Sequence, residues 1–255
     1  CLICMFSRSG NVTQALSLFD EMKRKALVPN VFAYNPLIFA LCKCDRVELA
    51  YELFEEMQAK FIDPDEILLV TILRPCTEAR ALDHGRHIHG CIIKKGYVID
   101  AIIGDSLVSF YCRCGKVNDA RVVFDALHEV NAVTWSTIIT GYAQKSQFRD
   151  ALFLFSEMQY AGVCLEQSTY LSVLKLCTCE IDVSWGMVLH DQIVKIGLET
   201  NVFIACALMK AYIRSGSLSD ARLIFNKSTK QDVMIWNVML SGYAQHGGVE
   251  ALQFF

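Results

Sequence analysis

Apolar residues recur at spacings of three and four along residues 31–65, which is the spacing of one face of an α-helix. The pattern is interrupted once, at Cys44-Asp45. It stops at Ile62-Asp63-Pro64-Asp65, because proline cannot continue a helix and pushes the preceding residue toward extended backbone. The segment therefore predicts two short amphipathic helices joined by a turn. The positions that carry the pattern are Leu37, Ile38, Leu41, Val47, Ala50, Leu53, Phe54 and Met57.

The same hairpin recurs along the chain, and one small residue near the start of each second helix marks its register. These residues are Ala15, Ala50, Gly85, Ala120, Ala151, Gly186 and Ala221, separated by 35, 35, 35, 31, 35 and 35 residues. A fixed period is typical of stacked helical repeats, and a small side chain there lets helices of adjacent hairpins cross closely. We therefore expect an all-α, right-handed superhelical solenoid of helix-turn-helix repeats, with the first helices inside.

A period of 101 residues lies over the shorter one. Trp135-Ser136 and the segment 141–144, Gly-Tyr-Ala-Gln, return as Trp236-Asn237 and the identical segment 242–245. Three unequal repeats thus form a triplet. The chain divides into a single array with a partial repeat at 1–30, full repeats at 31–65, 66–100, 101–131, 132–166, 167–201 and 202–232, and a partial repeat at 233–255.

Two prolines fall inside predicted first helices. We place Pro36 in the first turn of its helix, where its missing N–H group is not needed. Pro75 stands where the repeat 101 residues later has Leu176, in the helix interior. We therefore expect a kink at Pro75, or a local cost of about 3 kcal/mol.

Composition narrows the functional classes only slightly. The chain is 53% hydrophobic with a mean hydropathy of +0.32, but no apolar run reaches the length of a membrane span, so we assign the apolar residues to helix packing and expect no membrane partner. A net charge of −3 argues against a generic polyanion binder. Because the chain begins at Cys1, we interpret it as a fragment whose lack of a targeting segment carries no information.

Metal and catalytic chemistry find little support in the residue pattern. The Cys-x-Cys pairs at 42/44, 112/114 and 177/179 lack the Cys-x-x-Cys spacing that zinc sites favour, so we expect reduced cysteines acting as small apolar residues. His84, His87, His89 and Cys91 form the densest group of potential ligands, but the sister repeat keeps only His190. No phosphate loop, nucleophile motif or deaminase motif (His-x-Glu with Cys-x-x-Cys) is present. We expect no metal, no cofactor and no enzymatic activity in this segment.

Three segments carry a recognisable family pattern: Val31-Phe32-Ala33-Tyr34-Asn35, Leu53-Phe54-Glu55-Glu56-Met57 and Asp63-Pro64-Asp65. They resemble the pentatricopeptide repeat family. The 35/35/31 rhythm is similar to the plant PLS subclass, with P repeats at 31–65, 132–166 and 233–255, L repeats at 66–100 and 167–201, and S repeats at 101–131 and 202–232. The resemblance implies single-stranded RNA binding in mitochondria or chloroplasts, one nucleotide per repeat, often guiding cytidine-to-uridine editing with editing-complex proteins.

In this family the fifth and last residues of a repeat specify the base, the second wedges against it and a basic thirteenth residue lies near the RNA backbone. Helical spacing places the second, fifth and thirteenth positions on one face. The resemblance then implies base-specifying pairs Asn35 with Asp65, Asp105 with Asn131, Ser136 with Glu166 and Cys206 with Asp232, and Asn237 without its partner. It implies base-wedging residues Phe32, Ile102, Val133, Phe203 and Met234, and RNA-backbone residues Arg8, Lys43, Arg113 and Arg214.

The clearest pair is Asn35 with Asp65, which matches the family's uridine-preferring combination. We expect Asp65 to orient the Asn35 amide through a hydrogen bond or a water molecule. The L repeats have apolar fifth residues, Val70 and Leu171, that cannot hydrogen-bond a base edge.

Each column also has an ordinary structural interpretation. Basic residues at the ends of helices favour the helix dipole, and apolar second residues could pack between neighbouring repeats. A helical-repeat scaffold that binds proteins therefore remains the alternative to an RNA-binding array.

Overall fold

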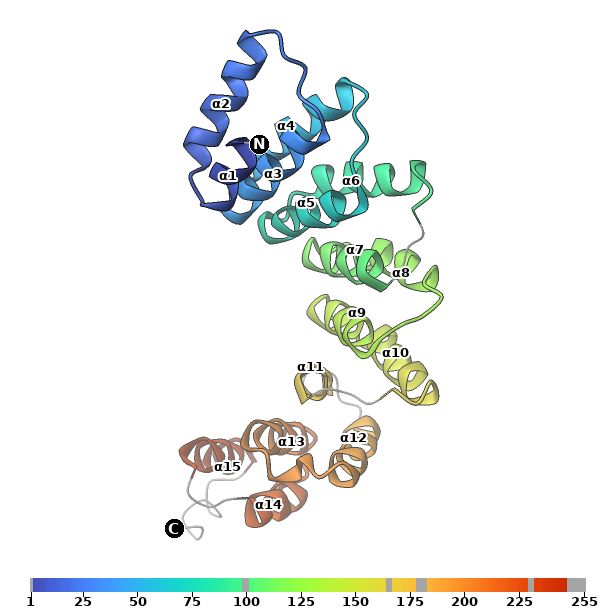
Figure 1. Ribbon diagram of the computed structural model, residues 1–255. Helices are drawn as coiled ribbons and strands as arrows, with labels where there is room; N and C mark the ends of the chain where they lie inside the picture. The colour runs from blue at the N-terminus through green and yellow to red at the C-terminus, as the bar shows by residue number, and fades with distance from the viewer. Residues whose placement is uncertain (1, 98–100, 164–166, 178–182, 229–231, 247–255) are drawn as a thin grey trace. The chain divides into compact units, whose positions relative to one another are not determined.

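The computed structural model describes residues 2–97, 101–163, 167–177, 183–228 and 232–246, and all regular structure in these ranges is helical (Figure 1). The chain forms two compact units, Cys1–Val130 and Asn131–Phe255. The first contains α1 (Leu2–Arg8), α2 (Val12–Arg24), α3 (Val31–Lys43), α4 (Val47–Ala59), α5 (Glu66–Ala79), α6 (Leu82–Lys94), α7 (Ala101–Arg113) and α8 (Val117–Asp125). The second contains α9 (Ala132–Gln144), α10 (Phe148–Tyr160), α11 (Gln167–Cys177), α12 (Val183–Lys195), the 3₁₀ turn η1 (Leu198–Thr200), α13 (Val202–Arg214), α14 (Leu218–Lys227) and α15 (Val233–His246).

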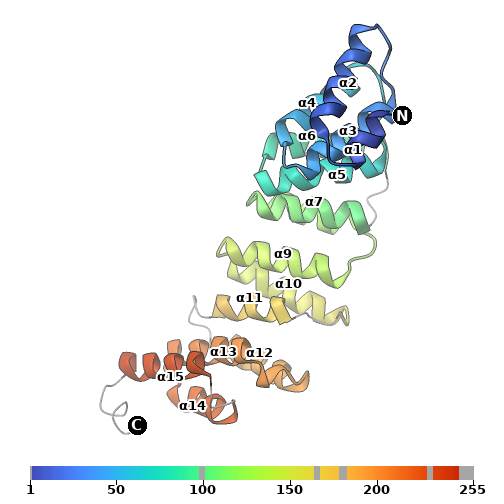
Figure 2. The same cartoon turned by 60° about the vertical axis from the view of Figure 1, so that its left-hand side comes forward.

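Each full repeat expected between residues 31 and 232 contains two helices. Within each unit the first helices of successive hairpins contact one another, α1 with α3, α3 with α5 and α5 with α7 in one unit, and α9, α11, α13 and α15 in the other (Figures 1 and 2). The predicted all-α solenoid of helical hairpins is therefore confirmed. The division into three repeat types stays a prediction.

The core lies where the hairpins contact each other. Ala15, Ala50, Ala120, Ala151 and Ala221, the alanines of the small-residue row, are completely buried. A Cβ atom added at Gly85 would lie 1.9 Å from the Phe110 ring of α7. The row is therefore small because the next hairpin leaves no room for a longer side chain, as predicted. Gly186 lies at a position whose side-chain environment the structure does not describe.

Two turn positions recur with left-handed backbone. Counting from the start of each repeat, position 15 joins the two helices and position 31 follows the second helix. Positive φ angles occur at Gly10, Asp45, Arg80, Gly115, Ser146 and Gly216 in the first column, and at Ala26, Phe61, Gly96, Gly162 and Gly197 in the second. Left-handed backbone at a helix C-terminus lets the next N–H groups satisfy the last carbonyls, so the turns are uniform although their residues vary.

The structure corrects the placement of Pro36. It is the sixth residue of α3 and not a first-turn residue, so the Phe32 carbonyl loses the N–H donor that a helix would supply. The Cys4 Sγ of α1 lies 3.5 Å from this carbonyl and donates to it, so the neighbouring hairpin supplies a partner.

Pro75 is buried inside α5, and the helix continues through it to Ala79. Pro75 therefore does not end the helix, although it has no N–H group to donate to the Thr71 carbonyl. In the described part of the chain, no helix has both the length and the apolar character needed to cross a membrane.

Candidate nucleic-acid interface

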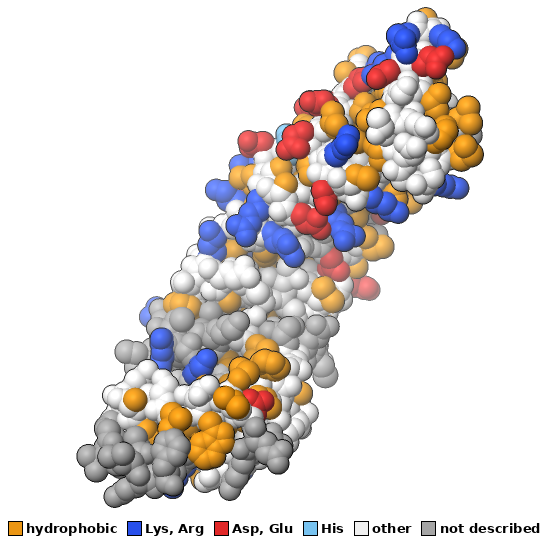
Figure 3. Space-filling model, turned by 90° about the vertical axis from the view of Figure 1, so that its left-hand side faces the viewer, with side chains coloured by type: hydrophobic (Ala, Val, Ile, Leu, Met, Phe, Trp, Pro, Cys, Tyr) orange, Lys and Arg blue, Asp and Glu red, His pale blue; other side chains and the backbone are white. Residues whose placement is uncertain are grey.

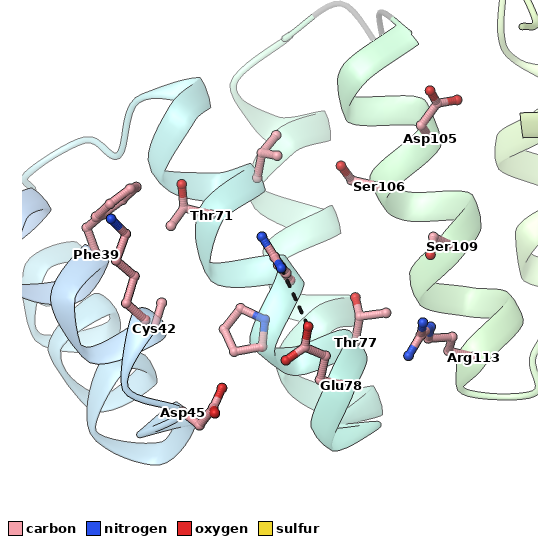
Figure 4. A pocket seen from close by; sticks show the side chains of 14 residues that line it. Phe39, Cys42, Asp45, Thr71, Thr77, Glu78, Asp105, Ser106, Ser109 and Arg113 are labelled. Atoms are coloured by element: carbon pink, nitrogen blue, oxygen red, sulfur yellow. Dashed lines mark ion pairs between the residues drawn. The ribbon is translucent and has the colours of Figure 1, made fainter. Parts of the chain in front are cut away.

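A groove of about 770 Å³ runs across α3, α5 and α7, the first helices of three successive repeats. Figure 4 shows side chains from all three helices projecting into it. The lining residues are Phe39, Cys42, Lys43, Asp45, Val70, Thr71, Arg74, Pro75, Thr77, Glu78, Asp105, Ser106, Ser109 and Arg113. The groove lies entirely within the amino-terminal unit.

The groove brings together the columns expected from the sequence. Val70 and Asp105 are fifth residues of their repeats, and Lys43, Glu78 and Arg113 are thirteenth residues. Positions 5, 9 and 13 lie one turn apart on one side of a helix. Phe39, Arg74 and Ser109 occupy position 9 and line the same groove, a column that the sequence interpretation did not include. The spacing i, i+4 from position 5 is the signal that could have found it.

The expected base-wedging residues are exposed apolar side chains. Phe32 is 76% exposed, Ile102 64%, Phe203 57%, Val133 55% and Met234 44%. These exposures argue against the alternative that the residues pack between neighbouring repeats. Isolated exposed apolar residues need no explanation, but here they occupy the second residue of α3, α7, α9, α13 and α15.

Asn35 and Asp65 form the hydrogen bond that the sequence predicted. Asn35 Nδ2 donates to Asp65 Oδ2 at 2.8 Å, while Asp65 Oδ1 accepts from the Leu68 N–H at the start of α5 at 2.8 Å. Asp65 is therefore both the N-cap of α5 and the residue that orients the Asn35 amide. The Asn35 Oδ1 atom is buried and has no partner within the protein. The identity of the two amide atoms follows from the carboxylate, which can only accept.

Other last-column residues act as helix N-caps. Asn131 Oδ1 accepts from the N–H groups of Val133 and Thr134 at 2.8 and 3.0 Å. Asp232 Oδ1 accepts from Met234 N–H at 2.8 Å. Capping by itself is enough to favour Asn and Asp at this position. Their recurrence therefore has a structural cause in addition to any contact with a base. Glu166 lies outside the described residues.

The remaining fifth residues differ in accessibility. Asn237 is exposed and Ser136 is half-buried, and Ser136 Oγ accepts from the buried Thr169 hydroxyl of α11 at 2.6 Å. Cys206 is only 4% exposed, and burial raises the pKa of its thiol, which keeps it protonated. Cys206 is thus the least accessible of the base-specifying residues that the structure describes.

The expected RNA-backbone residues Arg8, Lys43, Arg113 and Arg214 are all exposed at the ends of first helices. The Lys43 ammonium lies 4.8 Å from the centre of the Phe39 ring in the groove, a cation–π contact. Figure 3 shows Lys and Arg side chains interspersed with acidic ones over the upper part of the face that it presents. The positive charge is therefore local and is not a general property of the surface.

The histidine and cysteine group proposed and discounted as a metal site is used in contacts between hairpins. His84 stacks on Tyr51 with ring centres 3.7 Å apart, and His87 Nδ1 lies 2.7 Å from the Tyr51 hydroxyl. Cys91 Sγ accepts from Gln58 Nε2 at 2.9 Å. Among the residues that the structure describes, no group of three or more His, Cys, Asp or Glu side chains is arranged to hold a metal ion. Burial raises the pKa of Cys42, Cys76 and Cys112 to about 12.

A carboxylate on α4 joins the first two hairpins. Glu56 accepts hydrogen bonds from Lys23 and Lys60, both at 2.5 Å, and from the Tyr34 hydroxyl at 3.0 Å. Burial alone would raise the pKa of Glu56, but these three donors outweigh it and lower the pKa to about 2. The network stabilises the stacking of these two hairpins. It has no sequence pattern of its own, because Lys23 and Glu56 are 33 residues apart.

The described part of the chain is thus an α-solenoid whose first helices carry a groove lined by charged, hydroxyl and apolar side chains. Models of the PPR repeat match residues 25–58, 105–131 and 234–251, and a model of the PPR repeat family matches residues 1–38 and 130–178. The chain belongs to the pentatricopeptide repeat family.

Similar proteins of known sequence come from Arabidopsis thaliana. A mitochondrial pentatricopeptide repeat-containing protein is 33% identical over 96% of this chain and 42% of its own length. Another mitochondrial one is 32% identical over 99% of this chain and 30% of its own length, and a chloroplastic one is 32% identical over 99% and 40%. The chain therefore spans about a third to two fifths of these relatives.

Solved structures share the fold. The pentatricopeptide repeat protein PPR10 from maize is 20% identical with a TM-score of 0.66, over 98% of this chain and 38% of that chain. The PPR domain of Arabidopsis thaliana protein-only RNase P 1, in complex with tRNA, is 14% identical with a TM-score of 0.56, over 68% of this chain and 94% of that chain.

Proposed function

We propose that this chain binds single-stranded RNA sequence-specifically along the face formed by its first helices, one nucleotide per repeat. The observation that carries the proposal is the groove across α3, α5 and α7. Thirteenth residues of three successive repeats and fifth residues of two of them line it together, and Lys43 and Arg113 are exposed there. Hydrogen-bonding side chains, exposed apolar residues and cations on one face suit unstacked bases and a phosphate backbone.

The finer assignments follow from the same face. The base-specifying residues are Asn35 with Asp65, Asp105 with Asn131, Ser136 with Glu166, Cys206 with Asp232, and Asn237. The wedging residues are Phe32, Ile102, Val133, Phe203 and Met234, and the phosphate-binding residues include Arg8, Lys43, Arg113 and Arg214. The mitochondrial and chloroplastic relatives support an organellar location. The 35/35/31 rhythm supports the PLS subclass, in which the whole protein guides RNA processing or cytidine-to-uridine editing with editing-complex proteins. This segment supplies binding and needs no cofactor.

The test separates specificity from affinity at the repeat 31–65. Replacing Asn35 by Thr exchanges the amide for a hydroxyl, which should shift the preference of this repeat from uridine toward guanosine by about 1 kcal/mol, less than a bidentate contact to duplex DNA gives. Lys43→Ala should weaken RNAs carrying U or G equally, because a phosphate contact carries no base information. Binding of matched RNAs is measured before and after each change. If Asn35→Thr weakens both RNAs alike while Lys43→Ala alters the U/G ratio, the assigned roles are wrong. If the unaltered chain binds no single-stranded RNA, the RNA-binding proposal is wrong and the alternative is a helical-repeat scaffold that binds proteins.

A further inference from the structure

The L repeats carry their positive charge one helical turn earlier than the other repeats. At position 13 the P and S repeats have Lys43, Arg113, Gln144, Arg214 or Gln245, but the L repeats have Glu78 and Cys179. At position 9 both L repeats are basic, with Arg74 and, 101 residues later, Lys175. The P repeats have Phe39, Thr140 and Ser241 at this position, while the second S repeat has Lys210 together with its thirteenth-position arginine.

The structure places Arg74 in the groove between the two expected phosphate-binding residues of the neighbouring repeats. Arg74 of α5 lines the same groove as Lys43 of α3 and Arg113 of α7. Its side chain is 83% exposed, so its hydrogen-bond donors remain accessible to a ligand. Because positions 9 and 13 are four residues apart on one helix face, a cation at position 9 reaches the same groove as one at position 13.

The acidic residue at position 13 interacts with Arg74. Arg74 Nε lies 3.5 Å from Glu78 Oε1 (dashed line in Figure 4), which is an ion pair and too long for a good hydrogen bond. The pair is exposed, so it holds Arg74 only weakly. An incoming phosphate can therefore compete for the guanidinium, which presents five donors and suits phosphate in a bidentate arrangement.

We propose that Arg74 is the phosphate-binding residue of the repeat 66–100, and that Lys175 has the same role in the repeat 167–201. The inference rests on the proposed RNA-binding function and deepens it. Because the fifth residue Val70 cannot hydrogen-bond a base edge, this repeat contributes affinity through its backbone contact and little base preference. Glu78 opposes that contact by its negative charge.

The experiment uses the full chain and a single-stranded RNA selected from a random pool by the unaltered protein. Arg74→Ala should weaken binding about fivefold at 100 mM salt, because one lost phosphate contact removes about 0.7 from the slope of log affinity against log salt. The loss should be the same for RNAs with any base opposite this repeat. Arg24→Ala is the control, since it removes the same charge from the exposed face of α2, away from the groove.

Two further variants test the position and not only the charge. Glu78→Gln should strengthen binding, and the double variant Arg74→Ala/Glu78→Arg should restore it by returning the cation to position 13. An effect of Arg74→Ala no larger than that of Arg24→Ala, or a double variant as weak as Arg74→Ala, would overturn the inference and leave the proposed function standing. Failure of the unaltered protein to enrich any RNA would overturn the proposed function itself. Circular dichroism on each variant identifies any loss of folding.

Discussion

Histidine and tyrosine form the same contact between successive hairpins twice within the described ranges. His89 Nδ1 lies 2.9 Å from the Tyr111 hydroxyl, and His190 Nδ1 lies 2.9 Å from the Tyr212 hydroxyl. The 101-residue period has thus repeated a polar contact as well as a helix pattern. Burial lowers the pKa of both histidines, so the folded chain favours their neutral form.

This contact predicts a pH dependence of stability above the range in which carboxylates titrate. Folding lowers the pKa of each histidine below its unfolded value of about 6.5. The folded state therefore has its full stability when the pH is above about 6.5, and it loses stability as the pH falls below that value, because the unfolded chain binds the proton more readily. The melting temperature should therefore fall between pH 7.5 and 5.5. The stability that Glu56 contributes should be lost only below pH 4.5, its ordinary pKa, because folding lowers the pKa of Glu56 to about 2.

The double variant His89→Gln/His190→Gln is the test of this assignment. Glutamine retains polar side-chain atoms but does not titrate, so the melting temperature of the variant should change less over the same pH range. An unaltered dependence would show that other groups cause it.

Close packing between helices decides which residues the elements can carry. The α6 helix contains two glycines with opposite surroundings, since a Cβ atom at Gly85 would meet the Phe110 ring and one at Gly90 would meet nothing within 4 Å. Gly85→Ala should lower the free energy of unfolding by about 1–3 kcal/mol through overpacking. Gly90→Ala should raise it by about 0.5–1 kcal/mol, because alanine is the better helix former. Urea unfolding of both variants measures the difference, and equal signs would contradict the close crossing.

The turn after α4 carries a bulky residue where three other repeats have glycine. Phe61 has a φ of +58° and is 95% exposed, so it has the cost of left-handed backbone without any gain from burial. Phe61→Gly should raise the free energy of unfolding by about 1 kcal/mol. Glu52→Gly, in the exposed interior of the same helix, should lower it by about as much. A Phe61→Gly variant that unfolds more easily than the unaltered chain would show that the phenyl ring makes a stabilising contact.

Over the whole molecule, the net charge is negative although basic residues recur on the face where the proposed function requires them. The chain has a net charge of −3, yet the thirteenth positions supply Arg8, Lys43, Arg113 and Arg214. If each meets one phosphate, log affinity for single-stranded RNA should fall with log salt at a slope near −3, and near −4 if Arg74 and Lys175 also contribute, from about −0.7 per contact. Filter binding over a range of potassium chloride concentrations measures the slope. A slope near zero would remove all of these residues from the interface.

The sequence by itself determined the elements and their register. Hydrophobic periodicity reflects burial of one helix face, and the small-residue row reflects close helix crossing. Both features can therefore be predicted from the order of residues alone. The one-sided columns followed from helical geometry, and the Asn35 contact with Asp65 followed from the family resemblance. The placement of Pro36 was wrong because the residue pattern does not fix where a helix begins, and α3 starts at Val31.

Only the tertiary structure decided which polar residues from different repeats meet. Arg74 shares a groove with Lys43 and Arg113, and Glu56 joins Lys23 to Tyr34, because hairpins stack with residues more than 20 positions apart in contact. The structure also showed a second role for the last residue of a repeat. Asn131 and Asp232 cap the helices that follow them, which the sequence alone did not distinguish from contact with a base. Local sequence records periodic burial, since every repeat must bury the same face. It does not record pairwise contacts between repeats, because these depend on how two surfaces meet in space.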